Sequence, residues 1–289
     1  MPMAKTTRLK EKLDKLKEEM GKLAAYEKQM LASPDGQISL TDPDSRSMAT
    51  SGRGSGVVGY NVQVAVDTVN HLIVTHDVTN IGSDRSQLAS VAREAKAVLQ
   101  VDKLEAVADR GYFNGEEILA CEQAGICVTL PKPMTSGAKS EGRFGKQDFV
   151  YMPEEDVYRC PAGEKLKFYY ANEEHGQKMR RYWTNACKTC AIKDQCTTGK
   201  ERRITRWEHE HVLETVQQRL DQDPQAMRRR RETVEHPFGT LKMRMGATHF
   251  LMKTLPKVAS EMALSVLAYN LTRVMNIVGT RALLAAIRA

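Results

Sequence analysis

The hydrophobic period of the chain changes several times between residues 61 and 130, and these changes limit the fold more than any other feature. Val62, Val64 and Val66 alternate with less apolar neighbours, and a second apolar run at 72–74 follows a short polar break. This pattern is typical of a β-hairpin. The elements predicted after it are a helix over 84–99, a strand over 104–108, a helix over 115–124 and a strand over 126–130. This order predicts an α/β domain with a mixed sheet.

The N-terminal region has a helical period instead. Residues 5–30 carry Leu and Met at alternating spacings of four and three, with Lys and Glu between them. This spacing predicts an amphipathic helix that packs on its own domain, with a short coiled coil as the alternative. Residues 33–57 are rich in Ser, Gly, Asp and Pro, and this composition predicts a loop.

The second half of the chain begins with a change of composition. The stretch after Pro131 is rich in Gly, Lys and polar residues and interrupts the α/β pattern, so we interpret it as an inserted subdomain. From Trp207 onwards the pattern is helical, with a break at Pro256 before a long apolar helix over 257–277. The predicted parts are a charged helix over 1–32, a first α/β part over 33–130, a cysteine-containing insertion over 131–205 and a helical part over 206–289.

Composition limits the class of protein and its partners. The 289 residues are 41% hydrophobic and 27% charged, which excludes a mainly disordered chain. The net charge is +7, and residues 200–257 hold 13 basic and 8 acidic residues, which favours a polyanionic partner. The charged N-terminus lacks a signal-peptide core and no apolar run is long enough to span a bilayer. We therefore expect a cytoplasmic protein without a membrane partner.

Asp109 is the first residue that could carry chemistry. It ends the apolar strand predicted over 104–108 and precedes Arg-Gly-Tyr. Acidic side chains at the carboxyl end of a sheet strand lie where α/β folds place ligands, and Gly111 allows the backbone to turn away. A helix cap or a turn residue is the alternative interpretation of such an aspartate.

A second candidate site lies in the segment that follows a run of four arginines. Arg228, Arg231, Glu235 and Lys242 are spaced by three, four and seven residues, so they share one face of a helix. One carboxylate among three cations can hold a metal ion while the cations hold phosphates. A solvated, salt-bridged face is the alternative. Pro237 predicts that the helix kinks or begins just after Glu235.

The cysteines form the third candidate site. Cys187 and Cys190 form a CxxC pair, Cys196 follows it, and Cys160 lies upstream. Without an export signal, these residues favour thiols or metal ligands over disulfides. Four thiolates can complete a tetrahedral structural Zn²⁺ site, which would stabilise a polar insertion with little apolar core. A redox CxxC pair and simple free thiols are the alternatives.

Six motifs occur in order from about residue 38 to 276. They are SLTDPDSR (39–46), GYNVQVAVD (59–67), ADRGY (108–112), RCPAG (159–163), VEHPFGTLK (234–242) and AYNLTR (268–273). In these motifs the chain resembles the DDE transposases of bacterial insertion sequences. The resemblance implies a ribonuclease-H-like fold, here a mixed α/β sheet with an inserted cysteine-containing subdomain and a helical C-terminal part.

The resemblance also implies roles for individual residues. In the family three acidic residues hold two Mg²⁺ ions; Asp109 matches the second acid and Glu235 the third. Arg231, Glu235 and Lys242 fit the family's Tyr-Arg-Glu-Lys signature, in which Arg228 occupies the Tyr position, so these three cations are the expected DNA-binding residues. The cysteine insertion also looks like that of this branch of the family.

The first acid departs from the family pattern. In the family it lies on a strand ahead of the charged helical segment, and here only Met-Pro-Met-Ala precedes that segment. We therefore expect a transposase that lacks its N-terminal part. Asp42, Asp44 and Asp67 are conceivable substitutes, and Asp44 is the preferred one because it precedes the hairpin from a loop.

These observations predict a transposase that cuts and joins DNA at transposon ends with Mg²⁺, as a truncated copy. The resemblance implies DNA as partner, in the form of terminal inverted repeats and target DNA, and a homodimer on that DNA near the nucleoid. A catalytically inactive DNA-binding remnant or regulator is the main alternative. A zinc-ribbon nucleic-acid module is the third.

Overall fold

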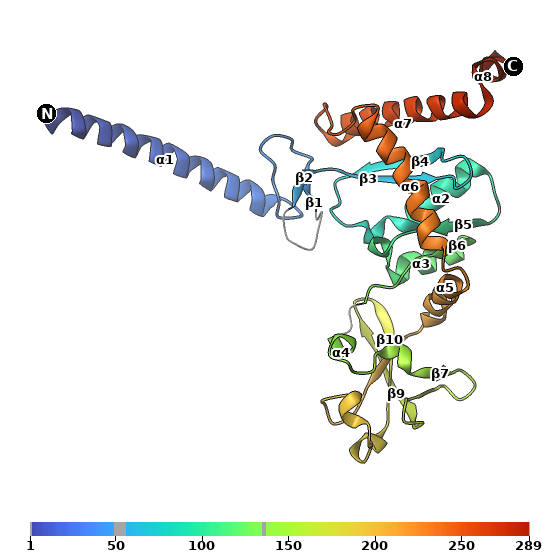
Figure 1. The fold of residues 1–289 in the computed structure, drawn as a ribbon. Coiled ribbons are helices and arrows are strands. Elements are labelled where there is room, and N and C mark those ends of the chain that lie inside the picture. The colour runs from blue at the N-terminus through green and yellow to red at the C-terminus, as the bar shows by residue number, and fades with distance from the viewer. Residues whose placement is uncertain (1, 49–55, 135–136, 289) are drawn as a thin grey trace. The chain divides into compact units, whose positions relative to one another are not determined.

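The computed structural model describes residues 2–48, 56–134 and 137–288, and side-chain positions from residue 7 onwards. The chain forms two compact units, each of which is described by itself (Figure 1). Unit 1 contains residues 1–100 and 231–289, and unit 2 contains residues 101–230. These divisions do not coincide with the boundaries expected at 130/131 and 205/206, and the four-part division stays a prediction.

Unit 1 is built around an antiparallel hairpin. Its elements are α1 (Pro2–Ala32), β1 (Arg46–Met48), β2 (Val57–Gly59), β3 (Asn61–Val66), β4 (Ile73–Thr79), η1 (Asp84–Ser86), α2 (Leu88–Leu99), the second part of α6 (Ala226–Met243), α7 (Leu255–Val278) and α8 (Thr280–Arg288). The β3–β4 pairing confirms the predicted hairpin. Helices α2 and α7 contact this hairpin on its two faces.

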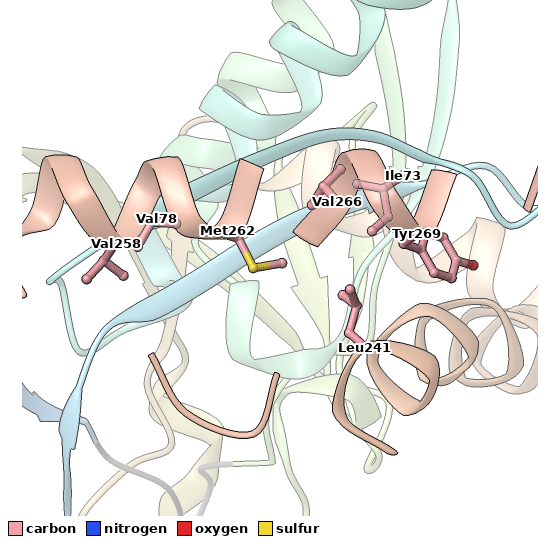
Figure 2. Packing of buried hydrophobic residues seen from close by; sticks show 7 residues of the cluster. All are labelled: Ile73, Val78, Leu241, Val258, Met262, Val266 and Tyr269. Atoms are coloured by element: carbon pink, nitrogen blue, oxygen red, sulfur yellow. The ribbon is translucent and has the colours of Figure 1, made fainter. Parts of the chain in front are cut away.

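The core of unit 1 lies between the hairpin and α7. The alternating valines of β3 pack against a buried cluster. Helix α7 contributes Val258, Met262, Val266 and Tyr269 to this cluster (Figure 2). The other face of β3 carries Gln63, which is buried and donates to the carboxylate of Asp84. Successive side chains of a strand point to opposite faces, so a strand with one apolar face has apolar residues at every second position. This alternation is the pattern that predicted the hairpin.

The helix α1 confirms the predicted helical period but not its expected packing. Its apolar stripe is exposed: Leu9 and Leu16 are each 60% accessible, and Met20 is 68% accessible. Periodicity shows that a helix has an apolar face, whereas it does not show which surface covers that face. The prediction that this helix packs on its own domain is therefore wrong within the single described chain.

The predicted loop over 33–57 contains regular structure. Strand β1 pairs antiparallel with β2, so that Arg46 lies opposite Gly59. Residues 49–55 of the predicted loop lie outside the described residues. Three-residue strands carry too few side chains to produce a readable alternation, which is why the pattern did not predict this pair.

Unit 2 combines a parallel strand pair with a larger antiparallel sheet. Its elements are β5 (Leu104–Val107), η2 (Arg110–Tyr112), α3 (Gly115–Gln123), β6 (Ile126–Thr129), α4 (Gly137–Ser140), η3 (Lys146–Asp148), β7 (Val150–Met152), β8 (Val157–Arg159), β9 (Lys165–Glu174), β10 (Gln177–Trp183), η4 (Asn185–Lys188), η5 (Lys193–Gln195), β11 (Ile204–Trp207), α5 (Glu210–Gln222) and the first residues of α6. The five-stranded sheet has the order β11-β10-β9-β8-β7.

Unit 2 has more apolar core than the composition of its polar stretch predicted. Tyr158, Leu166, Tyr182 and Ile204 are each at most 2% exposed and pack together on the five-stranded sheet. The aromatic residues supply this core, because each buries a large area even in a polar sequence. The expectation of an insertion with little core is therefore wrong.

The described strands and helices confirm the α/β class. The pairs β3–β4 and β5–β6 form separate two-stranded sheets. The predicted ribonuclease-H-like sheet thus stays a prediction. Among the described residues, no helix has both the length and the apolar character needed to cross a membrane.

Candidate functional site

Asp109 lies just beyond the carboxyl end of β5, which pairs in parallel with β6. Its Oδ1 accepts a hydrogen bond of 2.8 Å from the amide of Gly111 and so caps the 3₁₀ turn η2. The side chain remains 42% exposed. Asp109 is therefore a cap, as its alternative interpretation predicted, and its carboxylate still faces solvent where a ligand can reach it.

The second oxygen of Asp109 has a partner that the sequence did not reveal. Arg230, the third arginine of the four-arginine run, donates from Nη2 to Asp109 Oδ2 at 2.8 Å. The two residues are 121 positions apart, and no local pattern links them. The guanidinium occupies the oxygen that a metal ion would need, so a cation at Asp109 must displace or share this contact.

Helix α6 presents Glu235 to solvent. The helix runs without interruption from Ala226 to Met243, and Pro237 lies inside it, so the prediction that a helix begins after Glu235 is wrong. Pro237 is tolerated as one buried position of a stripe that also contains Thr233 and Leu241. The predicted site residues Arg228, Arg231, Glu235 and Lys242 are all exposed.

A hydrogen-bonded chain fixes this part of α6 to the rest of unit 1. Tyr269 donates from its hydroxyl to the carbonyl of His71 at 2.6 Å, and its oxygen lies 2.9 Å from His236 Nδ1. Partial burial lowers the pKa of His236, and the positive charge of Arg273 lowers it further. A neutral His236 can donate from Nδ1 to the tyrosine oxygen. The turn of α6 that carries Glu235 is thereby anchored to α7.

Asp44, the preferred substitute for the first acid, lies at the start of α7. Its Oδ2 accepts from the amide of Leu255 at 2.8 Å. Asp42 does the same for Thr254 at 3.1 Å, and its other oxygen accepts from Tyr60 at 2.7 Å. Burial opposes the charge of Asp42, but these donors outweigh it and hold its pKa below the ordinary value. Both carboxylates therefore cap a helix from a distant loop.

The third conceivable substitute also has local partners. Asp67 accepts from the amides of Val69 and Asn70 in the turn between β3 and β4, at 3.2 and 2.7 Å. Within the described part of the chain, no group of three or more His, Cys, Asp or Glu side chains is arranged so that it could hold a metal ion. Asp109 and Glu235 belong to different units.

Comparison with protein families gives a match in the second half of the chain. Residues 159–275 match the model of a family described as a transposase DDE domain. This stretch supports a DDE transposase. The matched stretch covers less than half of the chain; it includes Glu235 and the four candidate zinc ligands, whereas Asp109 precedes it. Neither the curated proteins nor the solved structures gave a match.

The family that this stretch resembles has a known general activity. DDE transposases cleave and transfer DNA, and they generally use a divalent metal ion such as Mg²⁺. Carboxylate oxygens are the ligands that Mg²⁺ prefers, so the chemistry of Asp109 and Glu235 suits this metal. Sulfur ligands favour zinc, and the cysteines therefore do not belong to a magnesium site.

Proposed function

We propose that this chain carries the metal-dependent cleavage and strand-transfer centre of a bacterial insertion-sequence transposase, with Asp109 and Glu235 as two of its acids. The observation that supports this most is the exposure of Glu235 within the matched stretch, on the opposite side of α6 from the buried positions Pro237 and Leu241. The ribonuclease-H-like fold that the sequence predicts is part of this proposal.

When bound, Mg²⁺ would supply a nucleophile from water or from a 3′ hydroxyl and stabilise charge on the scissile phosphate. Asp109 would hold metal through the oxygen that Arg230 now occupies, and Glu235 would hold metal from α6. Arg231 and Lys242 would bind phosphates on either side of Glu235, because cations on one helix stripe can follow a polyanionic backbone.

The transposon ends and target DNA are the proposed partners, and Arg228 would add a further phosphate contact. Binding of this kind depends strongly on salt and little on sequence. The exposed leucine stripe of α1 supports a homodimer, because a second copy would cover this apolar face. We expect the protein to act where its DNA is, at the nucleoid in the cytoplasm.

The capping of α7 by Asp42 and Asp44 favours a second candidate function. Carboxylates that already accept backbone amides are poor candidates for a third metal-binding acid. With only two acids at its site, the chain would bind DNA without cutting it and act as an inactive remnant or regulator.

A cleavage assay separates these two functions. Purified protein is incubated with plasmid DNA and with transposon-end duplexes in Mg²⁺ or Mn²⁺. For an active enzyme we expect Glu235→Gln and Asp109→Asn to lower the rate at least about 100-fold, as removal of one charge-stabilising group typically does. Glu94→Gln, an exposed glutamate of α2, is the matched control and should retain the full rate.

The outcomes point in different directions. Metal-dependent cleavage that survives Glu235→Gln contradicts the proposed site. Salt-dependent DNA binding without cleavage in either metal contradicts the enzyme and supports the remnant. Binding should then weaken in Arg231→Gln and Lys242→Gln by similar factors for unrelated DNA sequences, because phosphate contacts carry no base information.

A further inference from the structure

Four cysteines from separate turns of unit 2 line one cavity. Cys160 follows β8, Cys187 lies in η4 with Cys190 shortly after it, and Cys196 follows η5. The cavity volume is about 20 Å³, which is room for roughly one water molecule or one ion. Four sulfur donors around a space of this size are the ligand set of a structural zinc ion.

Backbone hydrogen bonds fix the turns that carry these thiols. The carbonyl of Cys160 accepts from the amide of Gly163 at 2.9 Å, in a turn where Gly163 has a φ of +87°. Glycine adopts this left-handed conformation without steric cost. The carbonyl of Cys190 accepts from Lys193 at 3.3 Å. These bonds fix the backbone of two of the turns that carry cysteines.

A cation with an unpaired donor lines the same cavity. Arg202 is among the lining residues, and its Nε is buried without a hydrogen-bond partner among the described residues. Its guanidinium lies 5.5 Å from the ring centre of Phe149. A buried unpaired N–H costs about 1–3 kcal/mol, so its retention calls for an explanation.

An anionic metal–sulfur centre would provide that explanation. Four thiolates around one Zn²⁺ carry a net charge of two negative units, and thiolate sulfur accepts N–H hydrogen bonds. Arg202 and Lys193 both line the cavity and would offset this charge. Neutral thiols, by contrast, leave the donor of Arg202 unsatisfied.

The four thiols of the cavity are available to a metal ion. All four cysteines are free, so no disulfide competes for them in the described chain. Four sulfur donors that line one small cavity favour a shared cation over four independent thiols.

We propose that unit 2 binds one structural Zn²⁺ ion through the four cysteines of this cavity, with Arg202 as an outer donor to their sulfurs. The four sulfurs do not form a closed coordination sphere, since no ready metal-holding group occurs among the described residues. Binding therefore requires the thiols to close on the cavity, and each bound thiol releases its proton to solvent. This zinc ion is separate from the proposed cleavage chemistry.

Metal analysis of the full chain tests the proposal. The protein, purified without a polyhistidine tag, should contain one equivalent of zinc, and replacement by Co²⁺ should give the sulfur-to-cobalt charge-transfer band of a tetrahedral thiolate site. Cys187→Ser and Cys190→Ser should lower the zinc content at least about 10-fold, because each removes a ligand. Cys127→Ala, in β6 and outside the cavity, is the matched control and should keep the metal.

Arg202→Gln tests the outer donor without touching a ligand. We expect it to keep the cobalt spectrum and weaken zinc affinity about 10- to 100-fold, the usual effect of removing an outer partner. Absence of zinc from the wild-type chain, with no cobalt thiolate band after reconstitution, overturns the proposal even if the serine variants fail to fold. A disulfide between Cys187 and Cys190 in mass spectra of the natively purified chain overturns it too. Neither result bears on DNA cleavage, which is measured separately.

Discussion

Asp44 offers a direct test of whether a carboxylate near the hairpin serves the fold or the chemistry. The first turn of α7 lacks a side-chain cap of its own, because the side chain of Thr254 makes no capping hydrogen bond. Pro256 in this turn has no amide hydrogen to be capped. Asp44 accepts the amide of Leu255 instead. Loss of a cap costs about 1 kcal/mol, and loss of a negative charge at a helix N-terminus costs about 0.3–1 kcal/mol more.

The two substitutions at this position separate the acceptor from the charge. Asp44→Ala removes both, so we expect unfolding free energy to fall by about 1–2 kcal/mol. Asp44→Asn keeps an acceptor and loses only the charge, so the loss should be about 0.3–1 kcal/mol. If Asp44 is a cap and not a metal ligand, neither variant should change DNA cleavage beyond its effect on stability.

Urea unfolding followed by far-UV circular dichroism measures these changes. Hydrogen exchange of the peptide that spans residues 250–262 locates them at α7. Both tryptophans, Trp183 and Trp207, lie in unit 2, so their fluorescence provides an internal reference for the other unit. The capping argument is refuted if Asp44→Ala leaves exchange and stability unchanged. It is also refuted if Asp44→Asn keeps stability while cleavage falls about 100-fold, since that result makes Asp44 a metal-binding acid.

Two further predictions concern pH and metal. Glu210 is buried, and its Oε1 lies 2.7 Å from the Nζ of Lys146. Burial raises the pKa of this carboxyl, but the nearby positive charge outweighs burial and the pKa is lowered. The pKa of Asp42 is lowered as well. Both carboxylates therefore add stability above their ordinary pKa values of about 4, and this stability is lost as pH falls through the lowered values. The urea concentration at the unfolding midpoint should stay level from pH 7 to about pH 5 and then drop. The drop should be less steep in Asp42→Asn. If the midpoint of that variant falls with pH as steeply as that of the wild type, Asp42 does not contribute this stability. Arg230→Gln frees one oxygen of Asp109, so an active enzyme should need several-fold less Mg²⁺ for half-maximal cleavage, and an increased requirement would show that Arg230 supports the metal.

Local elements were predictable because their cause is local. The alternation of Val62, Val64 and Val66 reflects a strand with one face on a core, and α7 covers that face. The helix α2 follows from apolar residues at helical spacing, and four of its residues are buried. Period and burial share one cause, which the sequence shows directly.

The apolar face of α1 and the continuity of α6 were harder to predict. The leucines of α1 have the right spacing for packing, yet nothing in the described chain covers them, because packing needs a partner surface that periodicity does not specify. Pro237 signals a break in an isolated helix. In α6 it is one of the buried contacts that hold the helix in place, and tertiary packing outweighs its local cost.

The candidate site likewise combines features that the sequence predicts with features that depend on the fold. Motif and spacing alone pointed to Asp109, Glu235 and the cysteines, because residue type and helical period are properties of a single segment. Whether a carboxylate is available is a different question, since its partners come from elsewhere in the chain. Arg230 reaches Asp109 over 121 positions, and Asp44 caps a helix 211 positions away.

Motifs, periods and spacings along the chain thus indicated a likeness to DDE transposases, the α/β class and the residue types that could carry chemistry. The folded chain was needed to show that Asp44 accepts the first amide of a helix, that Asp109 pairs with an arginine, and that four cysteines share one cavity with Arg202. Hydrogen bonds and ion pairs act over a few ångströms in space, and folding brings together residues that the order of the chain keeps far apart.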